Sequence, residues 1–324
     1  MDLYMAGSTF AGLNEWMQDK GYNKLLSYVN DKTAIENWRQ YYKQIGGKSN
    51  SKLFIDSGAF TAWTKNTIID VDEYINWINE RSDIIALYGQ IDVIPGKIGQ
   101  EPSSEERNKA AEATWQNYLY MRPKMKNPDG LLYTFHVNEP YEYLKQAMEW
   151  TDENGKHIPY IALGGMVGRT SQVRKDFLDN CFDIIKKSSN PNVKTHAFGM
   201  TSLDLLTKYP ITSADSTSWI MTAVTGSVFS PYGTICVSAE TLKRGDNLVN
   251  QLPATKEAML NYIKGTEFTY EELRDDYKKR EEFNIRYLQE WAKNYKPVEN
   301  FKPKIGTLMH IFNNYKDKGG VNNE

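Results

Sequence analysis

The fold is indicated first by residues 53–60, Leu-Phe-Ile-Asp-Ser-Gly-Ala-Phe, where a short apolar run ends in an aspartate. Similar short runs recur along the chain, and longer segments with the apolar spacing of helices lie between them. We predict strands at residues 3–6, 53–55, 84–91, 131–137, 160–163, 195–198, 211–214 and 234–237. We predict helices at residues 33–44, 71–80, 104–122, 141–154, 172–188 and 202–208. Strands that alternate with helices indicate parallel βαβ units.

Eight such strands predict a closed (β/α)8 TIM barrel of the α/β class, and a doubly wound open sheet is the alternative. The 324 residues suit a barrel of one domain, to which we assign residues 1–253. The pattern then becomes purely helical, so we expect residues 254–324 to form a C-terminal helical appendage packed on the barrel. Thr269 and Glu272 have the spacing of a capping box, and Ser171 is a candidate N-cap. The polar segment 316–324 is expected to fray.

The composition narrows the class of protein and of partner. Hydrophobic residues make up 40% and charged residues 25% of the chain, as is typical of a folded globular protein. The net charge is −2, so a nucleic-acid partner would need a local basic patch. Because neither a secretory signal nor an apolar run of membrane-spanning length is recognisable, we expect no membrane association and a cytoplasmic location. The two cysteines, Cys181 and Cys236, cannot supply the three or four thiolates of a structural zinc site. We expect neither a metal nor a cofactor.

Side chains capable of chemistry follow the predicted strands. The C-terminal ends of barrel strands open onto one face, so residues at these ends are expected to converge there. Each of the three aspartates, Asp56, Asp92 and Asp215, could instead be an ordinary helix N-cap, and His136 could be a structural histidine. Convergence of all of them is better explained by a site. The residues expected at this site are Asp56, Asp92, Asp215, His136, the glycine-rich turn of Gly164 and Gly165, Phe60 and Phe198.

Paired carboxylates on an aromatic-lined face favour chemistry at an anomeric carbon. One carboxylate can add to the carbon while the other moves the proton of the leaving group. Other nucleotide and hydrolase motifs are missing from the sequence: residues 164–168, Gly-Gly-Met-Val-Gly, do not match the dinucleotide fingerprint, and neither a phosphate-binding P-loop nor a serine nucleophile elbow occurs. The residues alone therefore predict glycosyl transfer or glycoside hydrolysis.

The ordered motifs resemble those of the tRNA-guanine transglycosylases and their DNA-modifying relatives. Residues 56–60, Asp-Ser-Gly-Ala-Phe, resemble the family's Asp-Ser-Gly-Gly-Phe/Tyr signature, and residues 161–166, Ile-Ala-Leu-Gly-Gly-Met, resemble its Gly-Gly-Leu turn. Residues 196–200, His-Ala-Phe-Gly-Met, resemble its Leu-Met-Gly segment, and residues 214–219, Ala-Asp-Ser-Thr-Ser-Trp, resemble the segment around its nucleophile. Residues 270–287 resemble its C-terminal helix. The resemblance spans about residues 53–290.

The resemblance implies a barrel enzyme that exchanges guanine in a polynucleotide for a 7-deazaguanine by double displacement. Asp215 would attack C1′ as the covalent nucleophile, and Asp56 would be its acid/base partner beside the base. Asp92 would accept hydrogen bonds from the purine N1–H and amine, and the Gly165 amide would read the carbonyl edge. The further substrate contacts implied are Ser57, Phe60, His136, Asn138, Gly164, Met166 and Phe198. His136 and Asn138 cover the place of a substrate-binding glutamine in the family, and the two phenylalanines would enclose the purine ring.

The chain departs from the family at its zinc site. The zinc ligands would lie between Cys236 and Asn284, where Cys236 is the lone cysteine and Phe283 takes the place of the histidine. In this respect the chain resembles the viral DNA-guanine transglycosylases, so we expect DNA as the partner, with tRNA as the alternative. A viral chain would act in the host cytoplasm, and a homodimer is compatible with the sequence. The candidate phosphate contacts are Arg169, Lys243 and Arg244.

Two further functions remain as alternatives. A catalytically silent barrel could serve as a nucleic-acid-binding subunit, although such a subunit needs neither Asp56 nor Asp215. A glycoside hydrolase acting on free sugars would also use two carboxylates and stacking rings such as Phe60 and Phe198. The ordered motif set disfavours the hydrolase.

Overall fold

The computed structural model describes residues 1–200, 202–295, 298 and 301, and it contains a closed barrel of parallel strands. In barrel order these are β1 (Asp2–Ala6), β2 (Lys24–Ser27), β3 (Leu53–Asp56), β4 (Ile85–Gly89), β5 (Leu131–His136), β6 (Tyr160–Gly164), β7 (Lys194–Ala197) and β8 (Ser213–Ser216). β1 closes the barrel by pairing with β8, with Tyr4 opposite Asp215. The predicted eight-stranded α/β barrel is confirmed, and the open sheet is excluded.

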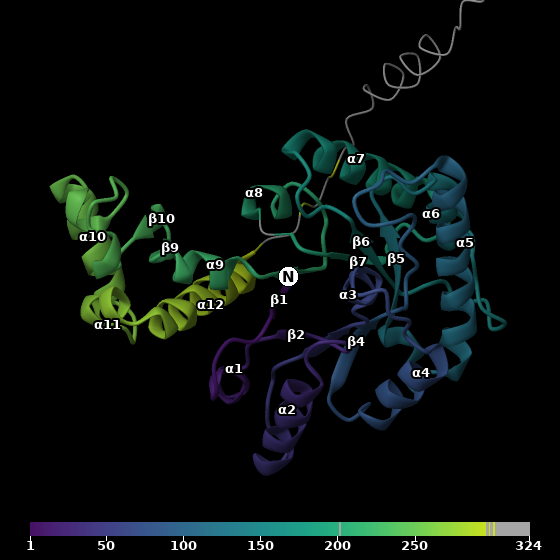
Figure 1. Ribbon diagram of the computed structural model, residues 1–324, viewed down its shortest axis with the longest axis horizontal. Coiled ribbons are helices and arrows are strands. Elements are labelled where there is room, and N and C mark those ends of the chain that lie inside the picture. Colours follow the sequence, from purple (N-terminus) through teal and green to yellow (C-terminus); the bar gives the residue numbers. More distant parts are fainter. Residues whose placement is uncertain (201, 296–297, 299–300, 302–324) are drawn as a thin grey trace, which may run out of the picture.

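Helices connect the strands and surround the barrel (Figure 1). They are α1 (Leu13–Lys20), α2 (Lys32–Gln44), α3 (Ala59–Thr64), α4 (Val71–Glu80), α5 (Ser104–Met121), α6 (Tyr141–Glu149), α7 (Ser171–Lys187), α8 (Leu203–Leu206) and α9 (Ser218–Val224), with the short 3-10 helices η1 (Arg122–Lys124) and η2 (Pro128–Gly130) before β5. The predicted bounds of α4 are confirmed, and those of α2, α5 and α7 are confirmed to within one residue at either end.

Three details of the helix prediction are wrong. α6 ends at Glu149 rather than at residue 154, because the Asp152 carboxylate accepts the backbone N–H groups of Asn154 and Lys156 and so forms a turn. The N-cap of α7 is Thr170 rather than Ser171, since its hydroxyl accepts the N–H of the third helical residue. α8 spans four residues, which is less than the predicted segment 202–208.

Two parts of the strand prediction are also wrong. β2 was not predicted, because Lys24 opens it and a lysine is rarely part of a buried strand. This lysine is fully buried and donates to the Gly7 carbonyl oxygen. The segment 234–237 was predicted as a barrel strand, but β10 (Gly233–Cys236) pairs antiparallel with β9 (Ser227–Ser230) outside the barrel. A short apolar run has the same pattern in a barrel strand and in a strand outside the barrel, because the run itself does not encode its pairing partner.

Side chains fill the inside of the barrel. Tyr4, Phe54, Leu132 and Tyr160 belong to one buried cluster there, and Phe198 packs against it. A larger cluster fills the space between the strands and the surrounding helices. Because the interior is packed, a substrate is expected to bind at the C-terminal rim of the strands rather than within the barrel.

The C-terminal part forms a second unit with its own buried apolar cluster. It comprises β9, β10, η3 (Ala239–Thr241), η4 (Leu248–Asn250), α10 (Pro253–Lys264), α11 (Tyr270–Asp275) and α12 (Tyr277–Asn294). α12 runs along α9 and contacts β1, so this unit projects from one side of the barrel (Figure 1). The predicted capping box of Thr269 and Glu272 is confirmed. The unit begins with β9, before the predicted boundary at residue 253. The expected frayed tail at 316–324 lies outside the described residues.

No helix within the described part of the chain is both long enough and apolar enough to cross a membrane.

Candidate active site

Asp215 lies near the end of β8 and is almost completely buried, with 7% of its surface exposed. Its Oδ1 accepts the backbone N–H of Gly199 at 2.8 Å and lies 3.2 Å from Nε2 of His196. Both contacts come from the end of β7, so neighbouring strands hold one carboxylate oxygen in place. Neither contact involves the other oxygen, Oδ2.

Asp56 ends β3 and begins the turn into α3. Its Oδ2 accepts the N–H of Gly58 at 3.1 Å. Gly58 has φ of +78°, and a Cβ at this position would meet the side chains of Val29 and Ser27, so the turn requires glycine. Burial, followed by the negative charges of Asp92 and Asp215, raises the pKa of Asp56 to about 7. A carboxyl group with this pKa can both donate and accept a proton near neutral pH.

His136 ends β5 and joins two carboxylates. Its Nε2 lies 3.2 Å from Oδ2 of Asp92, and its Nδ1 lies 2.9 Å from Oε1 of Glu139. Burial lowers the pKa of His136, but the charges and hydrogen bonds of Glu139 and Asp92 outweigh this effect and raise it to about 10. His136 is therefore an imidazolium at neutral pH, and both of its N–H groups are committed to carboxylates. Ser57 Oγ donates to the other oxygen of Asp92 at 3.5 Å.

The glycine turn packs closely against His136. A Cβ at Gly164 would lie 2.6 Å from Cδ2 of this histidine, which explains the need for glycine at the end of β6. Gly165 follows with φ of +74° and is exposed, whereas Met166 is buried.

The remaining predicted substrate contacts have different positions. Phe60 is 65% exposed on α3, and Phe198 lies half-buried with its ring centroid 4.7 Å from that of His196. Asn138 is exposed and has φ of +73°, so it forms the turn that folds Glu139 back onto His136. The aspartates, His136 and the glycine turn thus come together, while Asn138 contributes through the backbone.

Sequence reasoning missed Glu139 and did not assign a role to His196. For His196 a signal was present, because residues two apart along a strand share a face. His196 on β7 precedes Phe198, which lies just beyond the strand, by two residues, and Ser213 precedes Asp215 by two on β8. The alternation would have directed both pairs into the barrel.

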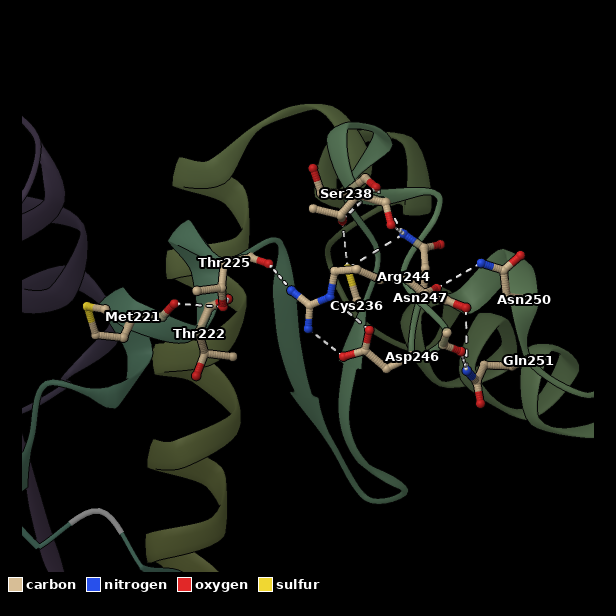
Figure 2. A network of polar contacts seen from close by, with 12 residues as sticks. Met221, Thr222, Thr225, Cys236, Ser238, Arg244, Asp246, Asn247, Asn250 and Gln251 are labelled. Atoms are coloured by element: carbon tan, nitrogen blue, oxygen red, sulfur yellow. Dashed lines mark hydrogen bonds and ion pairs between the residues drawn. The ribbon is translucent and has the colours of Figure 1, made fainter.

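The predicted phosphate contacts lie at two separate places. Arg169 and Lys243 are exposed, the first beside the glycine turn and the second in the C-terminal unit. Arg244 is paired with Asp246 and donates to the backbone carbonyl of Thr225 at 2.7 Å (Figure 2). Its charge is therefore balanced within the protein, and it braces the loop before α10.

The same loop surrounds Cys236, the lone cysteine of the C-terminal unit. Figure 2 shows its sulfur among the side chains of this network. Its Sγ lies 2.8 Å from the Thr241 hydroxyl, and Asn247 donates to the Ser238 carbonyl oxygen at 3.0 Å. No group of three or more His, Cys, Asp or Glu side chains suited to a metal ion occurs in the part of the chain that the structure describes. Hydrogen bonds of hydroxyl, amide and guanidinium groups hold this loop together.

A cavity of about 370 Å³ opens between the loops that follow β1 and β2, and its lining includes none of Asp56, Asp92 and Asp215. Thr9, Asn14, Asn30 and Asp31 are among the residues that line it. The charge of Asp31 acts on Asp56, so the cavity and the acidic centre are neighbours on the same face of the barrel.

A comparison of the chain with known protein families and with curated proteins finds no match. The function is therefore inferred from the geometry of the site and from the motif resemblance.

Proposed function

We propose that this protein is a guanine transglycosylase that replaces guanine in DNA with a 7-deazaguanine base. The proposal rests on one observation: two carboxylates at the C-terminal rim of the barrel have different environments. Asp215 has one oxygen held by two hydrogen-bond partners, whereas the pKa of Asp56 is raised to about 7 by burial and by its acidic neighbours. Such a difference between neighbouring carboxyl groups separates a nucleophile from an acid/base group.

The proposed reaction has two balanced steps. In the first, the free oxygen of Asp215 forms a bond to C1′ of the target nucleotide while the C1′–N9 bond breaks, and Asp56 gives its proton to the departing guanine. In the second, Asp56 takes a proton from the incoming base, whose nitrogen bonds to C1′ as the bond to Asp215 breaks. Each step returns Asp56 to the protonation state that the other step requires.

Base recognition in this proposal depends on Asp92. As a carboxylate it can accept both the N1–H and the exocyclic amine of a guanine-like edge. His136 holds this carboxylate in position with its charge, and the exposed amide of Gly165 is available for the purine carbonyl oxygen. The target nucleotide must leave its base stack to reach such a site. The neighbouring cavity offers space for an adjoining nucleotide.

DNA rather than tRNA is the proposed polynucleotide because the chain lacks the cysteines of the zinc site in the tRNA enzymes. The test is incubation with radiolabelled guanine and, separately, a labelled 7-deazaguanine, each with duplex DNA, single-stranded DNA or tRNA. We expect label to enter DNA. Label in tRNA alone would overturn the choice of DNA, and release of free sugar from glycosides without base incorporation would favour a hydrolase.

Matched isosteric variants test the two carboxylates. The covalent bond between Asp215 and C1′ should give an adduct of protein and polynucleotide that survives denaturation. We expect Asp215→Asn to abolish this adduct and to lower the rate of base exchange by at least about 10³-fold. Asp56→Asn should still bind the polynucleotide but should not exchange its base. An adduct that survives in the Asp215 variant refutes the assigned nucleophile, and wild-type protein that binds DNA without exchanging any base favours the silent barrel.

A further inference from the structure

The nucleophile candidate is connected to a buried chain of hydrogen bonds within the barrel. The Tyr160 hydroxyl donates to Ser213 Oγ at 2.6 Å, and Ser213 Oγ lies 2.7 Å from Nδ1 of His196. Nε2 of the same imidazole lies 3.2 Å from Oδ1 of Asp215. Three strands, β6, β7 and β8, contribute these side chains.

The arrangement of these hydrogen bonds favours one tautomer of His196. Because Tyr160 gives its proton to Ser213, the proton of the Ser213 hydroxyl is free to be donated to Nδ1. Nδ1 is then the acceptor, so the ring proton of a neutral imidazole lies on Nε2 and faces the carboxylate of Asp215. The opposite tautomer would place an unprotonated nitrogen against a carboxylate oxygen, and two acceptors would face each other.

We propose that His196 is a positioning residue for Asp215, fixed as the neutral Nε2–H tautomer by Ser213 and Tyr160. This inference rests on the proposed function of Asp215 as nucleophile. His196 is fully buried, and its ring lies among those of Tyr4, Phe54 and Phe198. It therefore acts on the substrate only through Asp215 and is not itself a catalytic residue.

The second donor to Asp215 supports this assignment. Gly199 has φ of +61°, a left-handed conformation that directs its N–H to the same Oδ1 that faces His196. Two fixed donors thus meet one oxygen and leave the other for C1′. When Asp215 is attached to the sugar, the held oxygen is the ester carbonyl, and when the incoming base displaces Asp215, the donors stabilise the returning negative charge. His196 keeps its proton throughout both steps.

The kinetic test uses two substitutions at His196. His196→Phe keeps an aromatic ring in an aromatic environment but removes the donor, and His196→Gln restores a donor. We expect the Phe variant to lower kcat by about 10²-fold, as loss of one preorganised donor does elsewhere. Its KM for polynucleotide should be unchanged, because the ring does not reach the substrate. The Gln variant should recover most of the lost kcat. In both variants the change of rate with pH that we assign to Asp56 should stay near pH 7.

Two tyrosines on the inner wall provide a matched control. Tyr160→Phe removes the hydroxyl that orients Ser213, whereas Tyr4→Phe removes a buried hydroxyl that has no hydrogen-bond partner among the described residues. We expect the Tyr160 variant to lower kcat and the Tyr4 variant to leave it unchanged. Equal losses in both would indicate a packing effect and overturn the positioning role.

The tautomer can be measured without any substrate. The method is NMR of protein with 15N-labelled histidine. The chain has four histidines, and the signals of His196 are identified as those that disappear in His196→Phe. We expect a neutral ring protonated at Nε2, and Ser213→Ala should disturb it. A ring protonated at Nδ1 overturns the inference, as does full kcat in His196→Phe. Failure of the proposed function is distinguishable, because Asp215→Asn would then retain whatever activity the protein has.

Discussion

Nε2 of His136 lies 3.2 Å from Oδ2 of Asp92, so an imidazolium and a carboxylate form an ion pair at the floor of the proposed base site. The positive charge offsets one of the acidic groups that gather there. A buried carboxylate without such a partner would tend to take up a proton and lose its ability to accept two hydrogen bonds from a purine edge.

The pH dependence of stability tests this ion pair. Because the pKa of His136 in the folded state is raised to about 10 from about 6.5 in the unfolded chain, the folded protein binds the extra proton between these values. Its stabilising contribution is therefore fully present below about pH 6.5 and is lost as the pH rises through 10. We expect the denaturation midpoint in urea to fall across this range, and to fall less in His136→Gln. An identical slope in both proteins would contradict the ion pair.

Asp56 should change the pH dependence of stability in the opposite direction to an ordinary salt-bridged carboxylate. Its pKa of about 7 is above the value of about 3.9 in an unfolded chain, so the folded state retains a proton that the unfolded state has lost. Stability contributed by this group is thus lost as the pH rises from about 4 to 7, and Asp56→Asn should remove that part of the slope. In kinetics, the rate of exchange should change through a group titrating near pH 7. A pH-rate profile that is flat between pH 5.5 and 8.5 would contradict the acid/base role.

The comparison of sequence and structure separates what a local pattern encodes from what it does not. Asp56, Asp92 and Asp215 were found because each lies at or just beyond the C-terminal end of a strand, and barrel topology brings these ends together. β2 was missed because the burial of Lys24 depends on a carbonyl oxygen and a tryptophan ring supplied by distant segments. β10 was misplaced because its partner strand is decided by the whole fold.

The pairing of ionised groups was even harder to predict from the sequence than the strands were. His136 has its second carboxylate, Glu139, three residues away, but the contact exists because Asn138 adopts a left-handed backbone conformation. The residue pattern around Asn138 does not predict this backbone conformation. Likewise, the raised pKa of Asp56 comes from the proximity of carboxylates on other strands, which is a distance in space rather than in sequence.

Gly199 provides a test of the backbone donor to Asp215. A Cβ at this position would meet the Val167 side chain, and its left-handed φ disfavours any other residue. Gly168 is a matched control, since it has φ of +74° but open space around its Cβ position. We expect Gly168→Ala to lose about 1 kcal/mol of stability from the backbone strain, and Gly199→Ala to lose more because its Cβ also meets Val167. Only Gly199→Ala should also lower kcat, by at least about tenfold, in exchange assays. A similar loss of kcat in Gly168→Ala would contradict the specific role of the Gly199 amide.

Arg169 and Arg244 were both predicted to contact phosphate, and the structure provides a reason to expect different behaviour. Arg169 is exposed beside the glycine turn, whereas the Arg244 guanidinium is paired with Asp246 and bonded to the Thr225 carbonyl oxygen. A free cation that neutralises one phosphate releases counterions, so Arg169→Ala should weaken DNA binding and reduce the slope of log affinity against log salt by about 1. Arg244→Ala should leave that slope unchanged and instead lower the thermal midpoint slightly, because a partly exposed pair contributes up to about 1 kcal/mol. Binding titrations at several salt concentrations measure both slopes. A reduced slope in the Arg244 variant alone would mean that the pair with Asp246 opens to accept the phosphate.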